Sequence, residues 1–268
     1  MTYKPGYRGF IEKRLSIVDK QGNLVDFIPN KVQIKYLEEG TGRDYILKAR
    51  QMGFSSLILA IFTVDFITKE NSRSVILADI SENASELLDR VKLYVESYGT
   101  KTGSPIQLKY NSKYELFNSS INSRYTIGTA DNTDFGRSKT ITNLHLSEFN
   151  FYRDPEKLLA GVMQAVVPEG RVIIESTANG FNFGKTYWDD TERGETGFKA
   201  MFFPASEFYD PEFLESKKRD LGRLYVQEYP ENALQAFVTS GESYFNKDSL
   251  ATYLQETQGA KEIWSAHK

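Results

Sequence analysis

The sequence has no cysteine and only two histidines, His145 and His267, among its 268 residues. Disulfide bonds, thiolate metal sites and cysteine nucleophiles are therefore excluded, and a histidine-rich zinc site is not expected. His145 lies within an apolar segment, where we expect a packed core histidine. No apolar run is long enough to span a membrane, and the charged segment 1–14 lacks the apolar stretch of a signal peptide. We therefore expect a cytosolic protein without membrane association.

Neither sign of charge dominates, because the sequence has 33 Lys and Arg residues and 36 Asp and Glu residues, for a formal net charge of −3. This balance argues against a protein that coats nucleic acid through its overall charge, although it leaves room for a local basic surface. The length suits one large α/β domain, or one domain with a small appendage. Composition alone leaves the function open.

Strands and helices are predicted to alternate along most of the chain, since short apolar segments alternate with longer segments of helical spacing. The predicted strands are 45–47, 74–79, 107–118, 124–129, 141–146 and 171–174. The predicted helices are 30–39, 55–68, 82–98 and 156–165. This order predicts an α/β fold with a central, mostly parallel sheet flanked by helices. In such sheets, ligands bind at the carboxyl ends of the strands.

The segment 48–56, KARQMGFSS, lies between a predicted strand and a predicted helix. Against the P-loop pattern GxxxxGKS, Lys48 takes the first glycine position, Gly53 the second and Ser55 the hydroxyl position. Gly53 lets backbone N–H groups approach an anion, the helix start adds its dipole, and Ser55 would bind Mg²⁺. The predicted nucleotide-binding residues of this segment are Lys48, Arg50, Gln51, Met52, Gly53, Phe54, Ser55 and Ser56.

Phe54 stands where the P-loop pattern has its lysine, so another cation must neutralise the phosphates. Lys48 and Arg50 lie in the same loop, and either side chain is long enough to reach back over a nucleotide. A glycine turn followed by two serines is also an ordinary helix start. Taken alone, this segment favours that plainer interpretation.

Two further predicted strands end in polar residues. Segment 141–148, ITNLHLSE, ends in a carboxylate and is typical of a Walker B element. Glu148 would orient and deprotonate the attacking water, and Ser147 stands where an aspartate usually supports Mg²⁺. After strand 171–174, hydroxyl and amide groups would contact the γ-phosphate or its water, and they belong to Ser176, Thr177 and Asn179. Each feature alone has a plain structural explanation, but the three in this order indicate a nucleotide site.

Three segments together resemble motifs of the large terminase subunit of tailed bacteriophages, a motor that pumps DNA into procapsids: 49–55 (ARQMGFS), 144–149 (LHLSEF) and 175–180 (ESTANG). The first is similar to this family's P-loop, in which the lysine is often displaced upstream. The third looks like its coupling motif. Glu228-Tyr229-Pro230, Ala236-Phe237 and Ser240-Gly241 are similar to the end of the family's ATPase domain. The likeness runs from about Ile28 to Phe245.

The resemblance implies a P-loop NTPase fold of the ASCE or RecA-like class that uses ATP and Mg²⁺. It implies that Gln33 reads adenine, with a surface glutamine as the alternative. Arg50 would contact phosphate within its own subunit. Arg137 would reach a neighbouring subunit as an arginine finger, with a solvated loop arginine or a DNA contact as alternatives. Lys48, Arg50, Arg137 and Glu148 are the expected catalytic residues.

The resemblance also implies three parts and a set of partners. Residues 1–42 form an N-terminal segment with the adenine-reading region, 43–207 the ATPase core, and 208–268 a helical lid and linker. The family's nuclease domain would begin where the chain ends, so no nuclease activity is expected of these residues. The implied partners are double-stranded DNA, the portal protein, the small terminase subunit and further copies in a ring, expected to be a pentamer. The expected location is the host cytoplasm, at the procapsid portal.

Two other functions remain open. One is a nucleotide-binding structural subunit with little hydrolysis, which the missing P-loop lysine favours. The other is a superfamily-2 helicase, because that class also has a glutamine upstream of its P-loop. Against a helicase, the sequence has no DExH or DExD box, and its length leaves no room for a second RecA-like domain.

Overall fold

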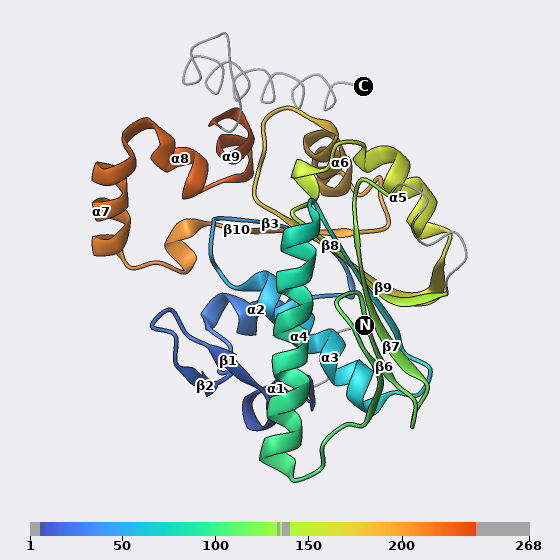
Figure 1. Ribbon diagram of the computed structural model, residues 1–268. Coiled ribbons are helices and arrows are strands. Elements are labelled where there is room, and N and C mark those ends of the chain that lie inside the picture. Colours follow the sequence, from blue (N-terminus) through green and yellow to red (C-terminus); the bar gives the residue numbers. More distant parts are fainter. Residues whose placement is uncertain (1–5, 133–134, 136–139, 240–268) are drawn as a thin grey trace.

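The computed structural model describes residues 6–132, 135 and 140–239, and in these ranges eight strands form one central sheet (Figure 1). The strand order is β10-β3-β9-β8-β4-β7-β6-β5. The strands are β3 (Arg43–Lys48), β4 (Arg73–Ala78), β5 (Leu108–Asn111), β6 (Glu115–Asn118), β7 (Ser123–Thr129), β8 (Ile141–Ser147), β9 (Val166–Ser176) and β10 (Lys199–Phe203). From β10 to β7 the strands run parallel, and β6 and β5 are added antiparallel. The predicted mostly parallel sheet is confirmed.

Strand β9 lies between β3 and β8, and it pairs with both in parallel. The carboxyl ends of these three strands therefore meet at one edge of the sheet. The P-loop segment follows β3, Glu148 follows β8, and the turn 177–180 follows β9. Three segments that are far apart in the sequence thus become neighbours.

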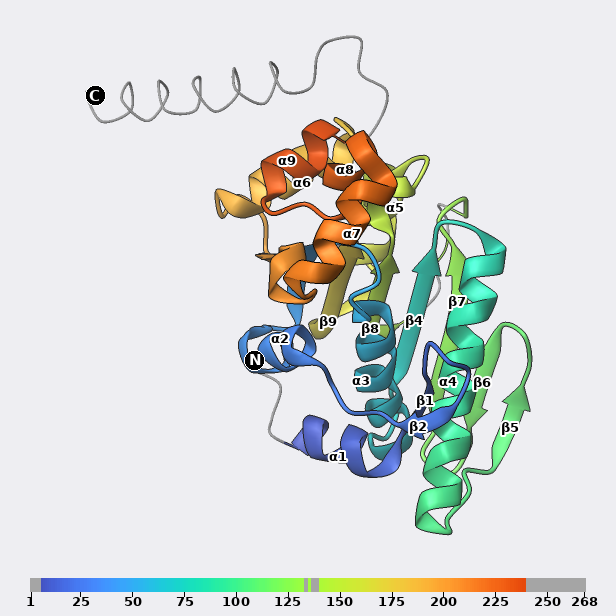
Figure 2. The same ribbon diagram turned by 90° about the vertical axis from the view of Figure 1, so that its left-hand side faces the viewer.

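Helices cover both faces of the sheet (Figure 2). Helices α3 (Phe54–Thr68) and α4 (Ser81–Thr102) pack with Ile46, Ile76 and Ile173 on one face. Helices α5 (Pro155–Met163) and α6 (Phe183–Glu192) pack on the other face, against strand residues of the opposite parity. Every residue of α3 from Leu57 to Ile67 is buried, as expected for a helix that is apolar on all sides.

The N-terminal part adds more structure than the sequence predicted. Helix α1 (Gly6–Arg14) and the two-stranded sheet of β1 (Ser16–Val18) and β2 (Leu24–Asp26) precede α2 (Lys31–Glu39), and only α2 was predicted. A capping box begins α2, because Asn30 accepts hydrogen bonds from the helix N-terminus and Gln33 accepts one from the Asn30 backbone.

Helix α7 (Pro211–Leu221) is followed by α8 (Tyr225–Glu228) and α9 (Ala233–Thr239). Short 3₁₀ turns occupy Phe149–Phe151, Ala205–Glu207 and Gly222–Leu224. The described part of the predicted 208–268 region is therefore helical, and residues 240–268 lie outside the described ranges. In those ranges, no helix is both long and apolar enough to cross a membrane.

Candidate functional site

The loop between β3 and α3 is shaped to receive an anion. Gly53 precedes α3 with a φ of +79°, a left-handed conformation that favours glycine. A Cβ atom added there would lie 2.8 Å from Nε2 of Gln33, so the loop also lacks space for a side chain. Among the described residues, no side chain caps α3. Its first backbone N–H groups are therefore left for another acceptor.

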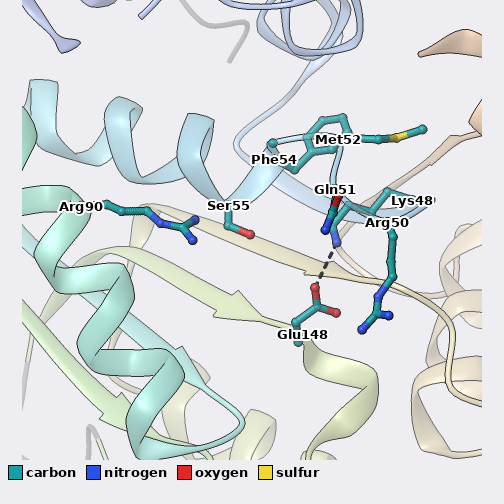
Figure 3. Close-up of a pocket in the computed structure, with 9 residues that line it drawn as sticks. Lys48, Arg50, Gln51, Met52, Phe54, Ser55, Arg90 and Glu148 are labelled. Atoms are coloured by element: carbon teal, nitrogen blue, oxygen red, sulfur yellow. Dashed lines mark hydrogen bonds and ion pairs between the residues drawn. The ribbon is translucent and has the colours of Figure 1, made fainter. Parts of the chain in front are cut away.

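A cavity of about 380 Å³ opens at this loop (Figure 3). Its lining residues are Lys48, Arg50, Gln51, Met52, Gly53, Phe54, Ser55, Arg90 and Glu148. All of them except Arg90, which lies on α4, were predicted as site residues from the sequence. Arg90 had no local signal, because a basic residue on a long amphipathic helix is ordinarily a solvated one.

Lys48 ends β3 and extends its ammonium group into the site. Its side chain is only 5% exposed, and Nζ lies 3.0 Å from Oε1 of Glu148 and 3.2 Å from Oε2 of Glu175. Burial alone would lower the pKa of Lys48, but the two carboxylates raise it above its usual value. Lys48 is therefore a buried, charged ammonium in the lining of the cavity.

Glu148 is held by the turn that follows β9. Its Oε2 accepts hydrogen bonds from the Thr177 backbone N–H at 3.1 Å, from the Thr177 hydroxyl at 3.3 Å and from the Ser176 hydroxyl at 3.4 Å. The Glu148 backbone is left-handed, with a φ of 55°, which is uncommon for a residue with a side chain. Such conformations cluster at functional sites, where neighbouring contacts hold them in place.

Glu175 is a site residue that the sequence analysis assigned no role. Its side chain is fully buried at the end of β9 and accepts hydrogen bonds from the hydroxyl groups of Ser55 and Ser147. Burial would raise the pKa of this carboxyl group, but Lys48 and His145 hold it well below its usual range. The only signal in the sequence that could have indicated a role for Glu175 was its position as an acid at the end of a predicted buried strand. His145 is buried as expected, with Nε2 3.4 Å from Oε1 of Glu175.

No protein-family model matches the chain, and no curated protein matches it in sequence. Solved structures do match. The large terminase ATPase domain of Thermus phage P74-26 is 18% identical, with a TM-score of 0.60 over 76% of this chain and 93% of that one. The large terminase of bacteriophage HK97 is 16% identical, with a TM-score of 0.68 over 89% and 56%. The chain has the fold of a large terminase ATPase domain.

A third match with this terminase fold is the large terminase of a thermophilic bacteriophage in complex with ADP. It is 13% identical, with a TM-score of 0.58 over 75% of this chain and 52% of that one. The chain therefore spans about half the length of this protein and of the HK97 protein. The predicted P-loop NTPase fold is confirmed.

Within the terminase fold, Gln33 joins α2 to the loop between β3 and α3. Its Oε1 accepts a hydrogen bond from the Asn30 backbone at 2.9 Å, and its Nε2 donates one to the Gly53 carbonyl at 2.6 Å. Both ends of the amide are thus engaged in supporting the loop. Adenine reading by Gln33 stays a prediction, and it would require the amide to exchange these bonds.

Arg50 connects the loop to the helical region that follows the sheet. Its guanidinium lies 3.0 Å from Oε2 of Glu228, and its backbone N–H donates to the Glu228 carbonyl. Its own carbonyl accepts a hydrogen bond from the hydroxyl of Tyr209. The side chain is 64% exposed, so it is accessible to a ligand in the cavity that it lines.

The remaining predicted residues are Asn179, Ser56 and Arg137, and neither Asn179 nor Ser56 is part of the cavity lining. The amide of Asn179 donates to the carbonyl of Asn150, and this bond ties the turn after β9 to the segment after Glu148. Ser56 is buried inside α3, is not part of the cavity lining, and its hydroxyl accepts a 3.4 Å bond from Arg90. Arg137 lies outside the described residues.

Proposed function

We propose that this chain is the ATP-hydrolysing motor domain of a viral DNA-packaging terminase. The strongest support is the convergence of three features on one cavity: the Gly53 loop, the Lys48 ammonium and the Glu148 carboxylate. The terminase fold adds to this support, because solved relatives of that fold include complexes with ADP and with ATP-γ-S.

The phosphates of ATP would lie at the N-terminus of α3, where free backbone N–H groups and the helix dipole favour negative charge. Lys48 would take the role of the missing P-loop lysine. In the structure, its ammonium is paired with Glu148 and Glu175. A polyphosphate competes with these carboxylates for the same cation, so binding would draw Lys48 toward the nucleotide.

Glu148 would act as the general base. A water oxygen attacks the γ-phosphorus, the bond to the oxygen bridging the β- and γ-phosphates breaks, and Glu148 accepts the proton of the water. Thr177 holds Oε2 of this carboxylate, whereas Oε1 faces Lys48. Once Lys48 turns to the phosphates, Oε1 is free to accept that proton.

A magnesium ion would arrive with the nucleotide. In the described ranges, no group of three His, Asp or Glu residues is placed to hold a metal ion. The hydroxyl of Ser55, which lines the cavity, fits the ion as a protein ligand. Bound there, the ion would neutralise charge on the β- and γ-phosphates.

In this function the chain would drive double-stranded DNA at the portal of a procapsid in the host cytoplasm. It would grip the phosphate backbone, because a packaging motor must accept any base sequence. Loss of the γ-phosphate would be registered by Ser176, Thr177 and Asn179, with Arg137 acting on a neighbouring subunit. The portal protein, the small terminase subunit and a ring of copies are the proposed partners.

ATP turnover by the wild type and by Glu148→Gln tests this function. We expect the substitution to lower turnover by about a hundredfold or more, since general-base catalysis contributes roughly that much, while ADP affinity is retained. Equal and negligible rates would instead favour a nucleotide-binding structural subunit. Strand separation with a duplex substrate would favour a helicase.

A further inference from the structure

Glu175 lies on β9, the strand between β3 and β8, and it contacts two residues that line the cavity, Lys48 and Ser55. On β9, Ile173 packs in the core cluster that contains α3, so the side chain two residues later, Glu175, faces the same helix. In the sheet register, Glu175 lies beside Ser147 of β8 on one side and beside Ile46 of β3 on the other. Ser147 stands where a Walker B element usually has an aspartate. The carboxylate of Glu175 is therefore on the strand next to that position.

The two oxygens of Glu175 have different partners. Oε1 accepts hydrogen bonds from the hydroxyl groups of Ser55 and Ser147. Oε2 lies 3.2 Å from Nζ of Lys48, an ammonium group that it shares with Glu148. A buried carboxylate is costly even when it is paired, so its presence calls for a reason beyond packing.

We propose that Glu175 supplies from β9 the carboxylate that Ser147 cannot supply from β8, and that it positions Ser55 for the divalent cation bound with the nucleotide. A serine that offers its oxygen lone pair to a cation must direct its proton elsewhere. Ser55 donates that proton to Oε1 of Glu175. Carboxylates that accept from a metal ligand in this way orient it and strengthen its binding. Glu175 is thus a positioning residue, and this role rests on the proposed nucleotide site.

A simpler role would be that of a counter-ion for Lys48. In that role the loss of Glu175 would change nucleotide affinity to the same extent with and without a divalent cation. In the positioning role, the loss falls on the part of the affinity that the cation provides. The ratio of the two affinities separates these roles, and a change in stability does not affect it.

The experiment measures the dissociation constant of ADP by calorimetry, once with Mg²⁺ and once with EDTA. For the wild type we expect tighter binding with Mg²⁺. For Glu175→Gln we expect this gain to shrink by about tenfold or more, the range in which lost outer-shell partners reduce metal affinity. Ser55→Ala should lose the gain to a similar extent, and the double variant should lose little more, because the two residues act as one unit.

The matched control is Asp65→Asn. Asp65 is also a buried carboxylate with a basic partner, Arg171, but it contacts the amide of Asn143 rather than any residue of the cavity lining. We expect this control to lower stability and to leave the Mg²⁺ gain unchanged.

A relocation variant tests the equivalence of the two strands. Ser147→Asp combined with Glu175→Ser moves the carboxylate from β9 to its register neighbour on β8. We expect it to restore most of the Mg²⁺ gain that Glu175→Gln lacks. A relocated carboxylate that binds ADP in EDTA without any gain from Mg²⁺ would contradict the proposed equivalence.

A Glu175→Gln variant with an undiminished Mg²⁺ gain would overturn the positioning role and leave Glu175 as a counter-ion. Should that variant fail to fold, Ser55→Ala gives the answer, because a full gain without the Ser55 hydroxyl also overturns it. A wild type that binds no ADP at all would remove the proposed function itself. Failure of the inference is therefore distinguishable from failure of the site.

Discussion

Lys48 holds two carboxylates at once, so its removal has two separable effects. In Lys48→Met, Glu148 and the buried Glu175 lose their cation, and the phosphates of a bound nucleotide would lose the cation proposed for them. We expect ADP affinity to fall by about tenfold or more through the lost charge-assisted contact. The free energy of unfolding should fall by about 3 kcal/mol, because an unpaired buried carboxylate remains.

Calorimetry and chemical denaturation measure the two effects of Lys48→Met. Lys217→Met is the control, since its ion pair with Asp220 is partly exposed and should contribute little. Full ADP affinity in Lys48→Met would mean that Arg50 provides the missing cation instead.

Gly53 is constrained by both its backbone and its surroundings. In Gly53→Ala, the left-handed backbone disfavours the new residue, and its Cβ would meet Nε2 of Gln33. We expect a loss of stability of about 1–3 kcal/mol and weaker ADP binding, because the loop must shift to relieve the contact. Thermal unfolding and calorimetry check both effects.

The control for Gly53→Ala is Gly9→Ala in α1, where no atom lies within 4 Å of the added carbon. Gly9→Ala should be neutral or slightly stabilising, by about 0.5–1 kcal/mol, because alanine favours helix. Equal behaviour of the two variants would argue against a constrained phosphate loop.

At the scale of elements, the loop between β3 and α3 is joined to α8 through Arg50 and Glu228. Glu228→Gln removes the charge that competes with phosphate for Arg50, so we expect a KM for ATP that is lower by about threefold, a modest effect because the pair is partly exposed. Arg50→Ala should raise the KM for ATP instead, and it should also lower ATP turnover. Steady-state kinetics of both variants tests this, and a shift in the same direction for both would contradict a phosphate role for Arg50.

Elements with a strong apolar pattern were predictable, and those defined by tertiary contacts were not. The apolar segments that became β3, β4, β8 and α3 were predicted close to their observed bounds. The predicted strand 107–118 is instead two strands, because the hydroxyl of Ser112 accepts from the backbone of Tyr114 and Glu115 and turns the chain. Strand β10 has no alternating pattern and gains its partner only from β3.

The candidate site shows the same division. Lys48, Ser55 and Glu148 follow a spacing that the sequence displays, and the structure brings them to one edge of the sheet. Glu175 does not follow any such spacing. Its place beside Ser147 depends on the order of strands in the sheet, and strand order is a property of the folded chain.

At the scale of the whole molecule, the proposed motor would act as a ring, and the proposed role of Arg137 belongs to that scale. We expect Arg137→Ala to bind ADP like the wild type but to lower ATP turnover by about a thousandfold in assembled packaging complexes, as for other arginine fingers. Turnover of isolated chains and of assembled complexes measures the difference. An unchanged rate in the assembled complex would remove Arg137 from the site.

Strand β9 carries Glu175 beside Ser55, and Thr177, directly after the strand, has the backbone N–H that holds Glu148. One continuous backbone therefore contacts both the proposed cation ligand and the proposed general base. A displacement of this backbone segment would therefore reach both groups together. Nucleotide binding and activation of the attacking water would then be coupled directly through the backbone of this one segment.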